Sequence, residues 1–338
     1  MKYNLMYDYA EGAHPDILKA LEKTNFVQQL GYGEDMYSLE AAQLIRDILE
    51  CDDADVHFVS GGTQANLIAL SSSLRPYESV IAANTGHISI HEAGAIESSG
   101  HKINEIPVED GKLTTEKIQE IVELHTDEHC VIPKLVYISN ATELGNIYNK
   151  KEIEQLSEFC KSNKLIFYMD GARLATSLTS GQQDLKISDL CELLDAFYIG
   201  GTKNGALLGE AIVLVNEDLK KNFRHSIKQR GGLLAKGRVI GLQFAELFRN
   251  GLFFDLALHA NKMAEILASG IAQKGYKFYT KPQTNMIFPV FNENAILKME
   301  EKYLFYRWKK LNDEKTVIRL VTSWATSEEK VIQFVNEL

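Results

Sequence analysis

Three short polar segments, each placed directly after an apolar run, carry the residue types from which an active site could be built. The apolar runs span residues 55–59, 165–169 and 196–199, and we expect each to be a strand. The segments that follow them are Ser60-Gly61-Gly62-Thr63, Asp170-Gly171-Ala172-Arg173 and Gly200-Gly201-Thr202-Lys203. Ligands of open α/β sheets bind beyond the carboxyl ends of the strands. The three segments are therefore expected to meet around one ligand.

The first segment has the outline of a phosphate site. Gly61 and Gly62 allow backbone N–H groups to approach an anion closely, and Thr63 adds a hydroxyl at the positive end of the helix that follows. Many Gly-Gly turns bind nothing, so a plain turn is the alternative. The segment indicates a phosphate only in combination with the other two.

Asp170 and Lys203 are unusual residues to find at the ends of apolar strands. A carboxylate in that position must meet a cation or a hydrogen-bond donor, and its alternative role is to cap the next helix. Burial of Lys203 among glycines would lower its pKa and free the amine for Schiff-base chemistry. The alternative for Lys203 is an ordinary Asn-Gly turn with an exposed side chain.

Two common phosphate motifs are absent. Lys203 is followed by Asn204, which excludes a P-loop, and Gly31-Tyr32-Gly33 lacks the third glycine of a dinucleotide fingerprint. A phosphate cradle, a carboxylate and an isolated lysine on three strand ends fit pyridoxal 5'-phosphate, which needs all three. The sequence therefore predicts this cofactor.

The elements that must position these residues follow an alternating βαβα pattern. Further apolar runs at 80–83, 135–139 and 211–215 predict strands, and 63–73 and 151–162 predict helices. Strands that are apolar throughout are typical of a sheet buried on both faces, so we expect a three-layer α/β/α domain with a mostly parallel sheet. Helical periods over 232–272, short strands at 277–279, 286–289 and 317–322, and a last helix capped at Thr326 predict a smaller α+β domain at the C-terminus. We divide the chain into an N-terminal segment (1–30), which packs on the small domain or a neighbouring chain, a large domain (31–245) and a small domain (246–338).

The composition excludes several classes of protein. Of 338 residues, 46 are Asp or Glu and 36 are Lys or Arg, and the resulting net charge of −10 disfavours nucleic acid and anionic membranes as partners. No apolar run is long enough for a bilayer span or a signal peptide. The four cysteines form no C-x-x-C pair, which disfavours a zinc ribbon and suits a reducing compartment. We expect a cytoplasmic protein that acts on a small molecule.

The sequence resembles the low-specificity threonine aldolases over nearly its whole length. These are pyridoxal-phosphate enzymes of the aspartate-aminotransferase-like fold, fold type I, in the β-eliminating lyase superfamily. The segments that carry the resemblance are DYAEGAHP, GYGEDMYS, SGGTQAN, HISIHEAGAIE, ISNATELGNIY, MDGARLA, GGTKNGALLGEA, KQRGGLLAKGR and IRLVTSWAT. DGARLA followed by GGTKNG is specific to the family.

The resemblance implies a role for each of the main site residues. Lys203 would form the Schiff base, Asp170 would face the ring nitrogen and His87 would stack on the ring. The phosphate would bind to Gly62 and Thr63, and the substrate carboxylate would face Arg173 and Arg319. Arg173 is also expected to bind the cofactor.

One departure from the family leaves two roles open. Many members carry Glu-Asn-Thr-His-Asn after the central strand, whereas this chain has Ser139-Asn140-Ala141-Thr142-Glu143, so a histidine base cannot be placed there. The phosphate-binding arginine of those members is also absent. We expect Arg230 or Lys236 to replace it, and we expect Tyr32 to reach the substrate site across an interface between subunits.

The histidines allow more than one reading. His87 and His91 are spaced i, i+4 and could hold a metal on a helix face, but no third ligand is evident. Stacking of His87 on the cofactor ring fits the resemblance better, and we predict no metal. The base that removes the substrate's β-hydroxyl proton stays open among His87, Glu92 and a bound water.

The predicted function is retro-aldol cleavage of L-threonine, L-allo-threonine or a related β-hydroxy-α-amino acid to glycine and an aldehyde. The alternatives are a β-eliminating lyase and a non-catalytic protein that binds the cofactor on the same fold. Enzymes of this fold place the cofactor at a subunit interface, so the resemblance also implies a homodimer or homotetramer.

Overall fold

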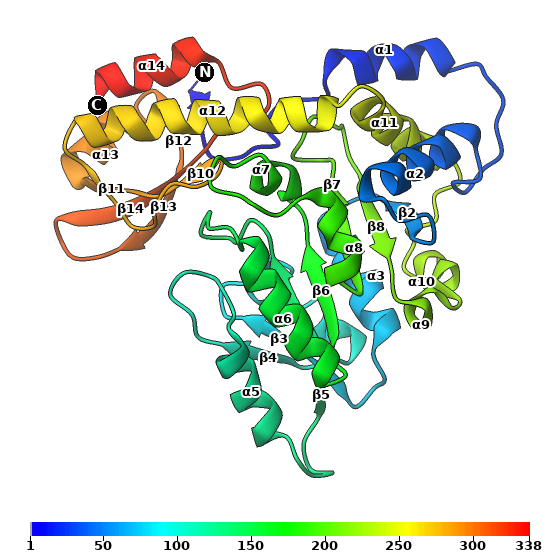
Figure 1. The fold of residues 1–338 in the computed structure, drawn as a ribbon. Coiled ribbons are helices and arrows are strands. Elements are labelled where there is room, and N and C mark those ends of the chain that lie inside the picture. The colour runs from blue at the N-terminus through cyan, green and yellow to red at the C-terminus, as the bar shows by residue number, and fades with distance from the viewer. Residues whose placement is uncertain (1) are drawn as a thin grey trace.

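A seven-stranded mixed sheet organises the larger part of the molecule. Figure 1 shows the computed structural model, which describes residues 2–338. The strands, in their order across the sheet, are β2 (Asp55–Val59), β8 (Glu210–Leu214), β7 (Ala196–Gly200), β6 (Ile166–Asp170), β5 (Ile132–Ser139), β3 (Glu78–Ala83) and β4 (Ile103–Ile106). Only β8 runs against its neighbours β2 and β7. The sheet is thus mostly parallel, as predicted.

Alternate side chains of the central strands enter two separate cores, which is why β6 and β7 are apolar up to their last residue. On β6, Phe167 and Met169 face one core, and Ile166 and Tyr168 face the other. The first core is closed mainly by α2 (Met36–Leu49), α5 (Thr115–Leu124), α6 (Lys150–Ser162) and α11 (Arg238–Arg249). The second is closed by α3 (Gly62–Ser73) and α10 (Phe223–Gln229). The result is the expected three-layer arrangement.

The C-terminal part forms a smaller sheet covered by helices. Its strands are β9 (Lys277–Phe278), β10 (Met286–Ile287), β11 (Pro289–Asn292), β13 (Tyr306–Lys310) and β14 (Lys315–Val321), and β14 pairs antiparallel with β10, β11 and β13. The helices are α12 (Leu252–Gln273), α13 (Glu293–Glu300) and α14 (Glu328–Glu337). Figure 1 shows α12 running above both parts of the molecule. Two packed parts of these kinds match the predicted fold class.

The N-terminal segment is anchored at two places. β1 (Tyr3–Asn4) pairs with β12 (Tyr303–Leu304) beside the small sheet, and α1 (Pro15–Thr24) packs on α11. Short helices complete the fold: α4 (His87–Ile90), α7 (Leu174–Leu178), α8 (Leu190–Leu193) and α9 (Glu217–Lys220), with 3-10 turns at Glu97–Ser99 and Ile187–Asp189. Within residues 2–338, no helix has the length and apolar character needed to cross a membrane.

The predicted cap of the last helix was wrong. α14 begins at Glu328 with Ser327 as its N-cap, whereas the Thr326 hydroxyl accepts a hydrogen bond from the Ser323 backbone N–H at 2.7 Å. Thr326 therefore closes the turn that precedes the helix. A threonine hydroxyl serves either purpose, so the sequence alone does not distinguish them.

Candidate active site

The three polar segments meet at one cavity of about 520 Å³ between the two parts of the molecule. The carboxyl ends of β2, β6 and β7 supply one side of it, and β13 and β14 supply the other. The lining residues are Tyr9, Ser60, Gly61, Gly62, Thr63, His87, His91, Glu143, Ala172, Arg173, Tyr198, Thr202, Lys203, Glu210, Met286, Tyr306, Trp308 and Arg319. The cavity is thus lined by six of the predicted site residues: Gly62, Thr63, His87, Arg173, Lys203 and Arg319.

The amino end of α3 opens directly into this cavity. Gly61 is its N-cap, and no side chain satisfies the first backbone N–H groups of the helix. These donors and the helix dipole favour an anion at this position. A Cβ atom on Gly62 would lie 2.9 Å from the Tyr198 hydroxyl oxygen, so this position requires glycine. The geometry suits the predicted phosphate site.

Asp170 lies just beneath the cavity and is held as a carboxylate. Its two oxygens accept hydrogen bonds from Tyr198 Oη (2.5 Å), Tyr137 Oη (2.6 Å), Asn66 Nδ2 (3.0 Å) and the Ala172 backbone N–H (3.0 Å). Burial by itself would raise its pKa, but the charge of His87 and these donors outweigh burial and lower the pKa. The lowered pKa favours the anionic form of Asp170.

The tyrosines around Asp170 are part of a row that the sequence prediction missed. Tyr137, Tyr168 and Tyr198 lie on three adjacent strands and are all fully buried on the α3 side of the sheet. The Tyr168 hydroxyl donates to Asn66 Oδ1 at 3.1 Å and so orients the amide that serves Asp170. The row could have been found in the sequence, because each of the three strands has a tyrosine two residues before its last residue.

Lys203 lies in the turn between β7 and β8, with its side chain partly buried in the cavity wall. Its amine makes no hydrogen bond or ion pair with any of residues 2–338. Burial lowers the pKa of Lys203, and the nearby charge of Arg173 lowers it further. This direction is the one predicted from the glycines around the lysine. A shifted, unpaired amine is suited to act as a nucleophile.

Glu210 is a buried carboxyl group beside Lys203 that the sequence prediction missed. It begins β8 in register with Val59 and Gly200, which end the strands leading to the phosphate segment and to the lysine segment. Its Oε2 accepts a hydrogen bond from the Gly201 backbone N–H at 2.8 Å. Burial raises the pKa of Glu210 to about 7, although the Gly201 hydrogen bond and the Lys203 charge oppose the increase.

His87 is fixed by a hydrogen-bonded chain of buried groups. Its Nδ1 lies 2.8 Å from Glu92 Oε1, and the same oxygen accepts from Asn66 Nδ2 at 2.7 Å. Because Asn66 also donates to Asp170, His87 and Asp170 are linked through two side chains. The Glu92 side chain is completely buried and does not line the cavity. Among residues 2–338, no cluster of three or more His, Cys, Asp and Glu side chains could hold a metal.

The two predicted carboxylate-binding arginines differ in their partners. Arg173 donates from Nε and Nη2 to the carboxylate of Asp8, at 2.6 Å and 3.0 Å. The Arg319 guanidinium instead lies over the rings of Tyr306 (4.6 Å) and Trp308 (5.3 Å), and its buried Nε has no hydrogen-bond partner. No carboxylate of residues 2–338 pairs with Arg319. Its Nη2 donates only a long hydrogen bond, 3.4 Å, to the Met6 carbonyl oxygen, so Arg319 can bind a carboxylate without displacing a protein carboxylate.

The other three predicted residues do not line the cavity. Tyr32 is exposed beneath Lys228, whose Nζ lies 4.8 Å from the ring centre, and its expected reach to the substrate site across a subunit interface stays a prediction. The Arg230 backbone carbonyl accepts from Gln64 Nε2 of α3 at 3.1 Å, which brings this segment close to the predicted phosphate site. Lys236 borders a separate hollow between α1 and α11.

The residues of the cavity fit pyridoxal phosphate. The cofactor's phosphate fits the helix end with free N–H groups. Its aldehyde fits the unpaired lysine, and its ring nitrogen fits the buried carboxylate. The unpartnered Nε of Arg319 in the same cavity calls for a further anionic group, which an amino acid supplies. The fold and the site together define a fold type I enzyme.

Comparison with known proteins gives the family. Residues 13–294, well over half of the chain, match the model of the family described as beta-eliminating lyase. A low-specificity L-threonine aldolase of a Pseudomonas strain is 33% identical over 98% of this chain and 95% of its own length. The corresponding protein of Pseudomonas aeruginosa is 31% identical over the same shares of the two chains.

A solved structure agrees with this assignment. The threonine aldolase of Leishmania major superposes with a TM-score of 0.98 at 47% identity and covers 99% of this chain and 98% of that one. The chain belongs to the beta-eliminating lyase family and, within it, to the low-specificity L-threonine aldolases. It is a lyase with threonine aldolase activity and uses pyridoxal 5'-phosphate, so the predicted family, enzyme class and cofactor are confirmed.

Proposed function

We propose that the chain cleaves L-threonine, L-allo-threonine and related β-hydroxy-α-amino acids to glycine and an aldehyde, with Lys203, Asp170, His87 and Arg319 as the principal site residues. The observation that carries these assignments is the pair of cations, Lys203 and Arg319, that line the same cavity and have no carboxylate partner among residues 2–338. One suits the cofactor and the other suits the carboxylate of an amino acid. The proposal extends the family membership to individual residues.

Each residue has a separate task in the reaction. Lys203 would hold the cofactor covalently, and its lowered pKa would favour an uncharged amine that can take a proton. The cofactor would supply the electron sink for the pair released from the Cα–Cβ bond. Asp170 would face the ring nitrogen as an anion, and His87, held by Glu92, would stack on the ring. The amino end of α3 would bind the phosphate.

Arg319 fixes the orientation of the substrate. A guanidinium can grip the substrate carboxylate with two parallel hydrogen bonds, and such a grip sets which bond at Cα stands across the ring plane. Tyr306 and Trp308 hold the guanidinium from its faces, which leaves its edge for the ligand. Arg173 supports the site mainly through its ion pair with Asp8.

A product assay tests this function. The purified holoenzyme is incubated with L-threonine and L-allo-threonine, and glycine and acetaldehyde are measured together with ammonia and keto acid. We expect equal amounts of glycine and acetaldehyde and no ammonia. Ammonia and a keto acid would instead identify a β-eliminating lyase, and the absence of any product with every β-hydroxy amino acid would identify a non-catalytic protein.

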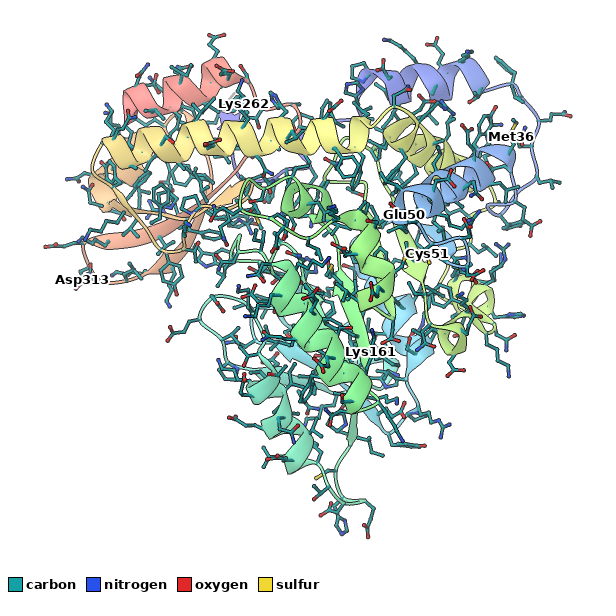
Figure 2. The ribbon with its side chains drawn as sticks, viewed as in Figure 1. Met36, Glu50, Cys51, Lys161, Lys262 and Asp313 are labelled. Carbon is teal, nitrogen blue, oxygen red and sulfur yellow. The ribbon has the colours of Figure 1, made fainter. Side chains whose placement is uncertain are left out.

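The proposal includes a homodimer or homotetramer. The stretch from the end of α1 into α2 exposes several large apolar side chains, among them Phe26 (95% exposed) and Leu30 (68%). Figure 2 shows Met36, which belongs to the same stretch, at the outer edge of the molecule. Clustered apolar surface of this kind is typical of a protein interface. We place a second copy of the chain on it, with Arg230 or Lys236 directed to the phosphate.

The proposal also includes a cytoplasmic location. Cys51, Cys130, Cys160 and Cys191 are all free thiols. Free thiols persist in a reducing compartment. Localisation of a tagged chain by cell fractionation tests this part.

A further inference from the structure

We propose that His91 is the general base that removes the β-hydroxyl proton of the substrate, an inference that rests on the aldol cleavage proposed above. The sequence prediction left this base open among His87, Glu92 and water and considered His91 only as a metal ligand. The position of His91 in the cavity, the free atoms of its ring and the charges around it support this role.

His91 lies one helical turn after His87 and lines the same cavity. It ends α4, and its backbone N–H donates to the His87 carbonyl oxygen at 2.9 Å. The centres of the two imidazole rings are 5.5 Å apart. Lys203 and Arg319 line the same cavity. An amino acid held between the cofactor lysine and Arg319 therefore has His91 in the wall that also carries His87.

The imidazole of His91 is free of other partners. Its side chain forms no hydrogen bond or ion pair with any of residues 2–338. His87 pairs through Nδ1 with Glu92 and is assigned above to the face of the cofactor ring, so we do not assign it the proton transfer at the β-hydroxyl. A general base needs a nitrogen lone pair that points to the reacting proton and is not already used. His91 meets this requirement, and its exposed position also allows it to exchange its proton with solvent.

The surrounding charges keep His91 neutral. Burial of part of the ring lowers its pKa, and His87, Arg319, Lys203 and Arg173 lower it further because each would repel an imidazolium. A neutral imidazole at pH 7 can accept a proton. The carboxylate of a bound amino acid will partly offset the charge of Arg319, so the imidazolium that forms is tolerated during the reaction.

The other candidate bases are less suited to the task. Glu92 is buried behind His87 and does not reach the cavity. Glu143 does line the cavity, but its Oε1 accepts from the Ser139 hydroxyl at 2.7 Å and from the His87 backbone N–H at 3.0 Å. We use Glu143 as the rival in the experiment.

The proposed step balances in atoms and electrons. The β O–H bond breaks and its proton forms an N–H bond on His91. The electron pair of that O–H bond becomes the second bond of the aldehyde carbonyl. The electron pair of the Cα–Cβ bond moves to Cα, where the cofactor accepts it. Cα then takes up one proton, so that the net change transfers the hydroxyl proton to Cα and releases glycine and the aldehyde.

Two reactions of the same holoenzyme separate this role from a structural one. Cleavage of L-threonine needs the β-hydroxyl base, whereas exchange of the α-hydrogen of glycine with D2O needs the cofactor and a base at Cα but no hydroxyl. We measure kcat for cleavage and the exchange rate by NMR for His91→Asn, His91→Ala and Glu143→Gln. Cofactor absorbance and glycine binding, followed by the change in absorbance, show whether each variant keeps its site.

We expect His91→Asn to lower kcat for cleavage by about a hundredfold or more, with exchange within about threefold of the wild type. Added imidazole should restore part of the cleavage by His91→Ala, and the acid limb of the pH profile should disappear in both variants. Glu143→Gln should not show this separation of the two reactions.

The inference would be overturned if the His91 variants cleave threonine at nearly the wild-type rate, or lose cleavage and exchange to the same extent. It would also be overturned if Glu143→Gln alone loses cleavage and keeps exchange. A wild-type enzyme that exchanges glycine but yields no aldehyde from any β-hydroxy amino acid would instead refute the proposed function.

Discussion

Asp8 occupies the guanidinium fork of Arg173 with both of its oxygens, at 2.6 Å and 3.0 Å, and so neutralises one of the two arginines in the site. Asn285 Nδ2 donates to the same carboxylate at 3.0 Å. Burial would raise the pKa of Asp8, but the charges of Arg173 and Lys203 outweigh burial and lower it. The site thus combines one arginine that is paired with a carboxylate and one that is not, and this difference supports the proposal that Arg319 receives the substrate carboxylate.

The first prediction concerns Arg319. Lysine at this position keeps the charge but loses the two parallel donors, so Arg319→Lys should raise KM for threonine by about tenfold or more while cofactor absorbance stays intact. Arg307→Lys is the matched control, because Arg307 lies on the same small sheet but pairs with Glu293 and Glu300 at the surface. An unchanged KM in Arg319→Lys would remove the carboxylate-binding role.

Asp170 provides the second prediction. Asp170→Asn replaces the anion beneath the cavity with a neutral amide, so the ring nitrogen loses its partner and the electron sink weakens. We expect cofactor to be retained in part and kcat to fall by about a hundredfold or more. Steady-state kinetics and the absorbance spectrum of the variant check this. Near-normal turnover would leave Asp170 with only a structural role.

The strand ends that carry the site residues could be predicted from the sequence because each is a local feature. Runs apolar at every position mark strands buried on both faces, and the polar residues that follow them must lie at the sheet edge. β2 was predicted at its observed bounds, and β6 within one residue at each end. β4 was missed because the buried Asn104 and the exposed Glu105 interrupt its apolar pattern, and β13 because its exposed positions carry Arg and Lys.

The contacts between distant segments could not be predicted in this way. Asp8 meets Arg173 across 165 residues, and Asn66 meets Asp170 across 104. No local pattern encodes such pairs, because they depend on how the N-terminal segment and α3 pack against the sheet. The buried position of Glu210 likewise depends on β8 lying between β2 and β7. These are also the contacts that set the charges of the site.

Lys203 is the subject of the third prediction. Reduction of the holoenzyme with borohydride fixes the bond between the cofactor and the amine that holds it, and peptide mapping then identifies the lysine. We expect the label on Lys203, because its amine lines the cavity and has a lowered pKa. Lys228, which lies over the Tyr32 ring outside the cavity, serves as the internal control and should stay unlabelled. A label on any other lysine would refute the assignment.

The fourth prediction concerns stability at acid pH. His57 is mostly buried against Phe223, and its Nε2 has no hydrogen-bond partner. Burial lowers its pKa to about 4, although the Asp55 carboxylate, 3.9 Å away, opposes the decrease. The unfolded chain binds a proton near pH 6.5 and the folded chain only near pH 4, so this residue's contribution is complete above pH 6.5 and is lost as the pH falls from about 6.5 to about 4.

Replacement of His57 should remove this acid sensitivity. The difference between the pKa of His57 in the unfolded and in the folded chain lowers the free energy of unfolding by at most about 3 kcal/mol as the pH falls from about 6.5 to about 4. Urea unfolding of wild type and His57→Phe at pH 7.5, 6 and 5 measures it. We expect the free energy of unfolding of the variant, relative to wild type, to increase steadily toward pH 5. A constant difference over this range would show that His57 stays protonated or becomes hydrated in the folded chain.

The last prediction is that two copies of the chain complete each other's active sites. Lys236 borders a hollow that Leu30 of the apolar stretch also lines, and Arg230 adjoins α3 through Gln64. The cofactor phosphate carries nearly two negative charges that backbone donors alone satisfy poorly. A chain with Lys203→Ala cannot hold the cofactor, and a chain with Arg230→Ala and Lys236→Ala cannot supply the cations. Each homodimer should therefore be inactive, or nearly so.

Mixed dimers discriminate between cations that act across the interface and cations that act within one chain. If they act across it, one of the two sites in a mixed dimer combines an intact Lys203 with intact cations from the partner, so mixing the two inactive variants should restore up to about half of the wild-type activity per mixed dimer. Light scattering and a tagged pull-down establish that mixed dimers form. If mixed dimers form and activity does not return, the cations act within their own chain or not at all, and a fully active monomer would exclude a shared site altogether.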